Sequence, residues 1–255
     1  MHTKRTHNSH NKSQRRLKKD GGKSMFDNKC VNDVIVEMEK SFGLFASEAQ
    51  LQLSFALAAY KLYGNRFSYI PEYPDSLSGF KRDEVDLLII DNLTKEKTMI
   101  EFKFKTTNYS NHSLEIDLLG GVKIKPTIMN SGNLGRYDCW SDIERLENYK
   151  SCGKAKACFF VFVTNDDNFL NKPKSECDFS VENSVSNGKK KMMWDDSKQT
   201  NGVLPTGHPK IKSIGTTRNR PLVIKGEYTF IYEPYCKSYG KRRADQYYIA
   251  TVEIK

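Results

Sequence analysis

The chain has 255 residues and a formal net charge of +10, from 41 Lys and Arg against 31 Asp and Glu. With 38% hydrophobic and 28% charged residues, it has the composition of a globular protein and excludes collagen-like and low-complexity chains. The excess of positive charge favours polyanions such as nucleic acid or an acidic membrane surface, although ordinary solubility charge explains it equally well.

The apolar segments are too short to cross a membrane. The longest runs, "VDLLII" and "CFFVFV", fall far short of the roughly 20 residues that span a bilayer. The N-terminus is polar and lacks the apolar region of a signal peptide. We therefore expect a cytoplasmic protein without a membrane partner.

The six cysteines are scattered and form no CxxC pair, so their spacing does not support a zinc site. Cys158 lies within an apolar run and is expected in the core. A chain of this length needs no disulfides for its stability, which fits a reducing cytoplasm.

The first part of the chain predicts a basic tail followed by two helices. Residues 1–28 lack apolar periodicity and are expected to be disordered. A short amphipathic helix follows over residues 31–42, with Gly43 ending it. A second helix over residues 47–64 is indicated by apolar residues three and four apart, with Ser47 as its N-cap and Gly64 after its end.

The middle of the chain predicts three strands, a helix and a fourth strand. The strands are expected over residues 66–74, broken by Pro71 and Pro74, over 84–91 and over 98–106, with a hairpin connection between the last two. A helix is expected over 139–152 and a buried strand over 155–166.

The C-terminal part predicts two further strands, over residues 226–235 and 245–254, that pair with each other. Residues 165–220 show little periodicity and are expected to form a long polar insertion. The predicted fold is therefore α/β, with a mixed central β-sheet flanked by helices and late C-terminal strands, as a single domain over residues 29–255.

Two predicted neighbouring strands carry carboxylates among apolar residues. In "TMIEFKFKT", Glu101, Lys103 and Lys105 alternate with apolar side chains, and in "DEVDLLII" Asp86 does the same. Counting outward from the hairpin connection places Asp86 close to Glu101. Two carboxylates at that distance repel unless a cation lies between them, and a divalent ion would satisfy both. Lys103 would then lie about 7 Å from Glu101 along the strand, within reach of a phosphate.

The pattern Asp86…Glu101-Phe102-Lys103, with Glu48 on a preceding helix, resembles the PD-(D/E)xK nuclease superfamily, which includes type II restriction enzymes and many repair and phage nucleases. The resemblance extends to the core order of that superfamily, helix–strand–strand–strand–helix–strand, over about residues 48–163. The chain departs from the pattern at the "PD" element, because Pro74-Asp75 precedes Asp86 by eleven residues. An assignment of Asp75 or Asp83 as the metal ligand therefore stays open.

The resemblance implies hydrolysis of DNA phosphodiester bonds in restriction, defence or DNA processing. It implies that Asp86, Glu101 and the backbone carbonyl of Phe102 hold Mg²⁺, with Mn²⁺ as an alternative ion, and that Glu48 assists a second ion or orients a water. Lys103 would position the attacking water and offset charge on the phosphoryl oxygens. A homodimer is compatible with double-strand cutting.

Two other functions stay open on the same fold: a catalytically inactive nucleic-acid-binding module and an RNA-processing nuclease. A glycosidase with paired carboxylates fits poorly with the basic charge and the adjacent lysines. Glu144 and Arg145, on the helix after the Glu-x-Lys strand, are further candidates for the site, whereas Trp140 is expected in the core. The candidate nucleic-acid contacts are basic residues on or after the predicted strands: Lys105, Arg136, Lys189, Lys190, Lys191, Arg242 and Arg243.

Overall fold

The computed structural model describes residues 25–74, 84–107, 116–118, 122–124, 132–171, 181, 186–188, 191–192, 222–236 and 245–255. Several sequence predictions fall outside these ranges: the tail up to residue 24, most of the 165–220 insertion, and the individual residues Asp75, Asp83, Lys189, Lys190, Arg242 and Arg243.

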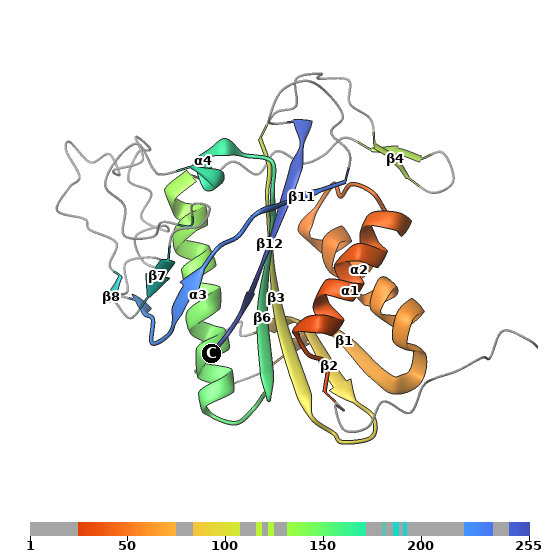
Figure 1. The fold of residues 1–255 in the computed structure, drawn as a ribbon, viewed down its shortest axis with the longest axis vertical. Coiled ribbons are helices and arrows are strands. Elements are labelled where there is room, and N and C mark those ends of the chain that lie inside the picture. The colour runs from red at the N-terminus through yellow and green to blue at the C-terminus, as the bar shows by residue number, and fades with distance from the viewer. Residues whose placement is uncertain are drawn as a thin grey trace, which may run out of the picture.

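A six-stranded mixed sheet forms the centre of the fold, in the order β1-β2-β3-β6-β12-β11. β3 and β6 are parallel, and the other neighbouring pairs are antiparallel. Helices α1 and α2 cover one face of the sheet and α3 covers the other (Figure 1). The predicted α/β class is therefore confirmed. The bounds are α1 (Asn28–Ser41), α2 (Glu48–Tyr63), β1 (Phe67–Pro74), β2 (Glu84–Asp91), β3 (Lys97–Lys105), α3 (Gly132–Ser151), β6 (Ala157–Thr164), β11 (Glu233–Tyr235) and β12 (Tyr247–Glu253).

Smaller elements complete the described chain. A 3₁₀ turn, η1 (Gly64–Arg66), joins α2 to β1, and the short helix α4 (Asp167–Leu170) follows β6. Three two-stranded sheets pair β4 (Ile116–Leu118) with β5 (Val122–Ile124), β7 (Ser186–Gly188) with β10 (Glu227–Thr229), and β8 (Lys191–Met192) with β9 (Leu222–Val223).

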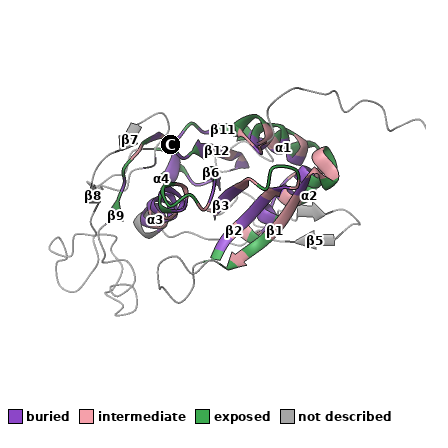
Figure 2. Cartoon of the chain, turned by 90° about the horizontal axis from the view of Figure 1, so that it is seen from below, coloured by how far each residue is buried: buried purple, intermediate pink, exposed green. Residues whose placement is uncertain are grey.

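The sheet separates two hydrophobic cores, because successive side chains of a strand point to opposite faces. On β3, Ile100, Phe102 and Phe104 belong to the core under α1 and α2. Met99 belongs to the core under α3, so the polar residues at odd positions of β3 face α3. Every residue of β6 is buried, as expected of a strand covered on both sides (Figure 2).

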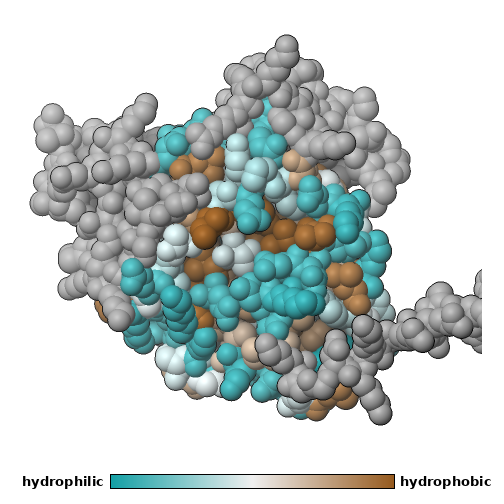
Figure 3. Space-filling view, viewed as in Figure 1, coloured by the Kyte–Doolittle hydropathy of each residue, from teal (hydrophilic) through white to brown (hydrophobic). Residues whose placement is uncertain are grey.

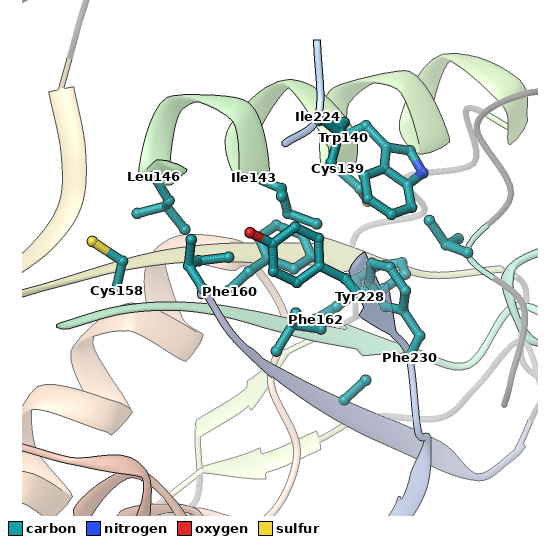
Figure 4. Close-up of a cluster of buried hydrophobic side chains, with 14 of the residues drawn as sticks. Cys139, Trp140, Ile143, Leu146, Cys158, Phe160, Phe162, Ile224, Tyr228 and Phe230 are labelled. Atoms are coloured by element: carbon teal, nitrogen blue, oxygen red, sulfur yellow. The ribbon is translucent and has the colours of Figure 1, made fainter. Parts of the chain in front are cut away.

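The core under α3 is rich in aromatic rings. Trp140 packs edge-on against Phe230 with ring centroids 5.7 Å apart, and this confirms that Trp140 is a core residue. Cys158 is also buried in this core, as predicted. Figure 4 shows the α3 side chains lying over those of β6 and the C-terminal segment: Cys139, Trp140, Ile143, Leu146, Phe160, Phe162, Ile224, Tyr228 and Phe230.

The predicted ends of α2 are confirmed, whereas α1 and α3 begin earlier than predicted. The Ser47 side chain accepts a hydrogen bond from the Gln50 amide, and Gly64 follows α2 with φ +56°. α1 begins at Asn28 after an Asp27 cap, and Phe26 is buried in the core. The predicted tail boundary at residue 28 is therefore too late. α3 begins at Gly132, seven residues before the predicted start.

Two predicted irregular segments are ordered. β1 runs unbroken through Pro71, which an edge strand tolerates because one side of its backbone has no partner strand. Residues 165–171, placed in the polar insertion, instead pack against the core: Asn165 and Asp166 are buried, and Phe169 and Leu170 of α4 belong to the α3-side core. The predicted strand over residues 226–235 is divided into β10 and β11. β11 pairs with β12 as predicted, whereas β10 pairs with β7, and β12 also pairs with β6.

The described surface in the view of Figure 3 is mostly hydrophilic, with hydrophobic side chains in small separate areas. No helix within the described ranges is long and apolar enough to span a membrane.

Truncation of Phe102 tests the packing that supports β3. The ring is fully buried and packs edge-on against Phe55 of α2, with centroids 5.2 Å apart. We expect Phe102→Ala to lower the free energy of unfolding by about 3–5 kcal/mol, measured by urea denaturation and circular dichroism. Leu93→Ala, at a residue 79% exposed, is the control and should cost less than about 0.5 kcal/mol. Equal costs for the two variants would contradict the described packing.

Candidate active site

The candidate site lies where β2 and β3 move apart. Their ladder runs from Ile90↔Lys97 to Leu87↔Ile100, and the next step of the same register places Asp86 opposite Glu101. Beyond that point the backbone amides of β3 bind carboxylates in place of a neighbouring strand. The Phe102 amide donates to Asp86 Oδ2 at 2.6 Å, and the Phe104 amide donates to Glu48 Oε2 at 2.8 Å. The predicted proximity of Asp86 to Glu101 across the hairpin is therefore confirmed.

Glu48 reaches this point from the first position of α2. The Ser47 cap fixes the start of the helix, and Gln50 Oε1 accepts a hydrogen bond from the Ala46 amide. The N-terminus of a helix carries partial positive charge, which favours a carboxylate there. Glu48 therefore joins residues of β2 and β3 although it lies more than fifty residues before Phe104 in the chain.

Helix α3 supplies two further charged residues from the opposite direction. Asp142 Oδ2 lies 2.8 Å from Lys103 Nζ, and Asp142 Oδ1 lies 3.1 Å from Arg145 Nη2. The Arg145 guanidinium also binds both oxygens of Glu101, with Nε 3.0 Å from Oε1 and Nη2 2.7 Å from Oε2. Lys103 Nζ is 3.9 Å from Glu48 Oε1. These contacts make one continuous chain of alternating charges.

From the sequence, Arg145 was predicted only as a further candidate for the site, and Asp142 was not predicted as a site residue. A signal was present, because Asp142 and Arg145 are three residues apart and so lie on one face of a helix. Ile143 and Leu146 between and beyond them are buried and fix the packing of that helix on the sheet.

The site has more negative than positive charge. Four carboxylates, from Glu48, Asp86, Glu101 and Asp142, face the two cations Lys103 and Arg145. When all six side chains are ionised, they carry a net charge of −2. Within a buried site this excess is costly, and a divalent cation would remove it.

The pKa values of the carboxyl groups reflect this excess. Burial raises the pKa of Asp86 above its ordinary value, while the Phe102 amide and Lys103 partly oppose that rise. Burial likewise raises the pKa of Glu48, against the opposing effect of Lys103. For Glu101, burial and the nearby carboxylates raise the pKa well above its ordinary value, and Arg145 is the main group that stabilises its charge.

Lys103 remains an ammonium group. Burial alone would lower its pKa, but the carboxylates of Asp142 and Glu48 outweigh burial and raise the pKa well above 10.5. A lysine held in this state does not accept a proton near neutral pH. Its chemistry is therefore that of a fixed positive charge and hydrogen-bond donor.

The donor set suits a hard divalent cation such as Mg²⁺, because it consists of carboxylate oxygens with an excess of negative charge. The present positions do not complete such a site. Both oxygens of Glu101 bind Arg145. Within the described ranges, no group of three or more His, Cys, Asp or Glu side chains is placed to hold a metal ion. A metal ion bound to Glu101 would compete with Arg145 for the same carboxylate.

The predicted nucleic-acid contacts are more enclosed than the sequence indicated. Lys105 is only 9% exposed. Arg136 is buried, donates a hydrogen bond to the carbonyl oxygen of Asn168 and lies over the Phe169 ring, so it joins α3 to α4. Lys191 lies in β8, and its side chain is outside what the structure describes.

Glu144, the other candidate on α3, contacts the C-terminal segment of the chain. Its Oε1 accepts a hydrogen bond from the Val223 amide at 2.7 Å. The neighbouring Glu147 accepts from the amides of Lys225 and Gly226 and from the Tyr228 hydroxyl. Both carboxylates therefore attach the C-terminal segment to α3, on the side of the helix away from the Glu101 pair.

Comparison with known proteins found no match. No protein-family model matches the sequence, and neither a curated protein nor a solved structure matches the chain. The resemblance to the PD-(D/E)xK superfamily thus rests on the element order and on the four side chains Glu48, Asp86, Glu101 and Lys103.

The excess of buried negative charge predicts a pH-dependent effect of Asp86→Asn in metal-free buffer. The folded-state pKa of Asp86 is raised above 3.8, so the folded protein binds more protons than the unfolded chain above that pH, and this carboxyl lowers stability as pH rises. Asparagine keeps an oxygen for the Phe102 amide and removes the charge. We expect its melting temperature to match that of the unmodified chain near pH 4 and to exceed it at pH 8, by about 2–4 °C per kcal/mol relieved.

Differential scanning calorimetry across this pH range measures the effect. Asp33→Asn is the matched control, because Asp33 lies on α1 with its side chain 48% exposed and pairs only with Lys29 and Tyr63 among the described contacts. A lower melting temperature for Asp86→Asn than for the unmodified chain at pH 8 would contradict the description of Asp86 as an undercompensated buried charge.

Proposed function

We propose that the protein is a Mg²⁺-dependent endonuclease that hydrolyses DNA phosphodiester bonds, in a restriction, defence or DNA-processing setting. One observation supports it above all: Asp86 lies opposite Glu101 at the divergence of β2 and β3, together with Glu48 and Lys103. The net charge of +10 also favours a polyanionic substrate.

In this proposal the carboxylates of Asp86 and Glu101 and the carbonyl of Phe102 hold the ion. The Phe102 amide points into the gap beside β2, where it binds Asp86. The amide and carbonyl of one residue in an extended strand point the same way, so the Phe102 carbonyl faces the same gap. Mg²⁺, or Mn²⁺ in its place, would supply Lewis-acid activation of the phosphate and of the attacking water.

Lys103 and Glu48 carry the remaining roles. The Lys103 ammonium offsets negative charge that builds on the phosphoryl oxygens and helps orient the water, and it does not act as the base because it stays protonated. Glu48 holds the Phe104 amide and limits the mobility of Lys103 through its charge. Lys105, two residues further on the same side of β3, is proposed to contact a neighbouring phosphate.

A second candidate is a nucleic-acid-binding module without catalytic activity. The observation that favours it is the closed Glu101–Arg145 pair, in which both carboxylate oxygens are already bound. An RNA-processing nuclease is the third candidate, since the described residues of the site have no feature that separates DNA from RNA. Homodimer formation remains a proposal that sedimentation analysis of the full chain would test.

The proposal predicts metal-dependent cleavage that requires the site residues. The purified 255-residue chain is incubated with supercoiled plasmid DNA and, separately, with single-stranded RNA, in Mg²⁺, in Ca²⁺ and in chelator. We expect nicking or linearisation of the plasmid in Mg²⁺ only. Asp86→Asn and Lys103→Met should each lower the cleavage rate by at least about 100-fold, because each removes a charge that acts on the phosphate or its metal.

The controls are Asp33→Asn and Lys29→Met, which remove the same charges from an exposed pair on α1. Circular dichroism establishes that each variant is folded. Cleavage in chelator, or unchanged cleavage by Asp86→Asn, would contradict the proposal. Binding of DNA without cleavage in any metal would favour the inactive module, and cleavage of RNA alone would favour the third candidate.

A further inference from the structure

Arg145 binds both oxygens of Glu101, one of the carboxylates that the proposed metal site needs. Glu101 has a side chain only 1% exposed, and Arg145 binds both of its oxygens at 3.0 and 2.7 Å. A planar guanidinium matches a carboxylate in this two-point manner, which is stronger and more specific than a single ion pair. The pair is therefore a defined arrangement of the buried site.

A buried carboxylate in this position needs a cation. Without a cation the charge of Glu101 would be held away from water, beside two other carboxylates from Asp86 and Asp142. Arg145 supplies the cation as the protein stands. A divalent ion bound to Asp86 and Glu101 would supply it as well, and it would compete with Arg145 because two cations held on one carboxylate repel each other.

We propose that Arg145 is a built-in counter-cation that occupies Glu101 in the metal-free protein and gives it up when a divalent ion binds. This inference rests on the proposed metal site and adds a form of regulation to it. Arg145 stabilises the folded protein before the metal binds and lowers the apparent metal affinity, because each metal ion has to displace it.

The surroundings of Arg145 allow this exchange. Its side chain is 28% exposed, so the guanidinium can withdraw toward solvent, whereas Glu101 cannot. Asp142 lies one helical turn before it and binds the same Nη2 atom at 3.1 Å that holds Glu101 Oε2 at 2.7 Å, so Arg145 has a second carboxylate partner. Asp142 also binds Lys103, so it would keep both cations close to the site after the exchange. Arg145 is a positioning residue in this account, acting through Glu101.

Titration with Mn²⁺, followed by electron paramagnetic resonance of the free ion, tests the exchange without depending on activity. The full chain is stripped of metal and compared with Arg145→Gln and Arg145→Lys. We expect Arg145→Gln to bind Mn²⁺ at least about tenfold more tightly, because a competing cation in direct contact with Glu101 is gone. Arg145→Lys keeps the charge but cannot hold both oxygens, so its affinity should lie between the other two.

Two control variants show whether a change in Mn²⁺ affinity comes from the contact between Arg145 and Glu101. Arg66→Gln removes an arginine from another ion pair, with Asp91 at 3.4 Å, and should leave the Mn²⁺ affinity unchanged. Asp86→Asn should weaken Mn²⁺ binding and thereby assign it to the site. Equal or weaker binding by Arg145→Gln would overturn the exchange while leaving the metal site intact. Equal affinity of Arg145→Lys and the unmodified chain would also overturn it, because net charge alone would then decide affinity.

If none of the variants shows Mn²⁺ binding that depends on Asp86, the proposed function is overturned as well. Should Arg145→Gln fail to fold, as judged by circular dichroism, the comparison of Arg145→Lys with the unmodified chain decides the same question.

Discussion

Buried carboxylates lie where β2 and β3 stop pairing, and their charges need positive partners. This need determines how the charged side chains are arranged in this part of the structure. Glu48, Asp86, Glu101 and Asp142 come together where two strands no longer pair, and their charges are met by two cations and two backbone amides. Such a cluster destabilises a fold unless each charge has partners, so its presence in the centre of a well-packed sheet calls for a functional explanation. Coordination of a divalent ion is the explanation that we propose.

The fold makes this cluster possible by packing on both sides of β3. Phe102 and Phe104 lie under α1 and α2, while Glu101 and Lys103 face α3. The apolar side fixes the strand, and the polar side presents its charges to a helix whose own charges are complementary. A shift of β3 by one residue would move Phe102 and Phe104 out of the core under α1 and α2 and place Lys103 in it, so the register is fixed by this packing.

The sequence allowed the sheet side of the site to be predicted, because the short hairpin connection fixes the register that places Asp86 near Glu101. Ser47 also identified the start of α2, and hence the position of Glu48. The α3 side was not predicted, since the contact of Arg145 with Glu101 joins residues 44 positions apart and depends on how a helix packs. The first seven residues of α3 were missed because Gly132 and Gly135 disfavour a helix by propensity, whereas packing, seen in the burial of Arg136 and Tyr137, favours it.

Anomalous diffraction from crystals grown with Mn²⁺ would show whether a divalent ion binds to the carboxylates of Asp86 and Glu101. We expect a manganese peak within coordination distance of both carboxylates, with the Arg145 guanidinium no longer bound to both Glu101 oxygens. Crystals with saturating Mn²⁺ that show no peak there, and an unchanged pair between Arg145 and Glu101, would contradict the proposal.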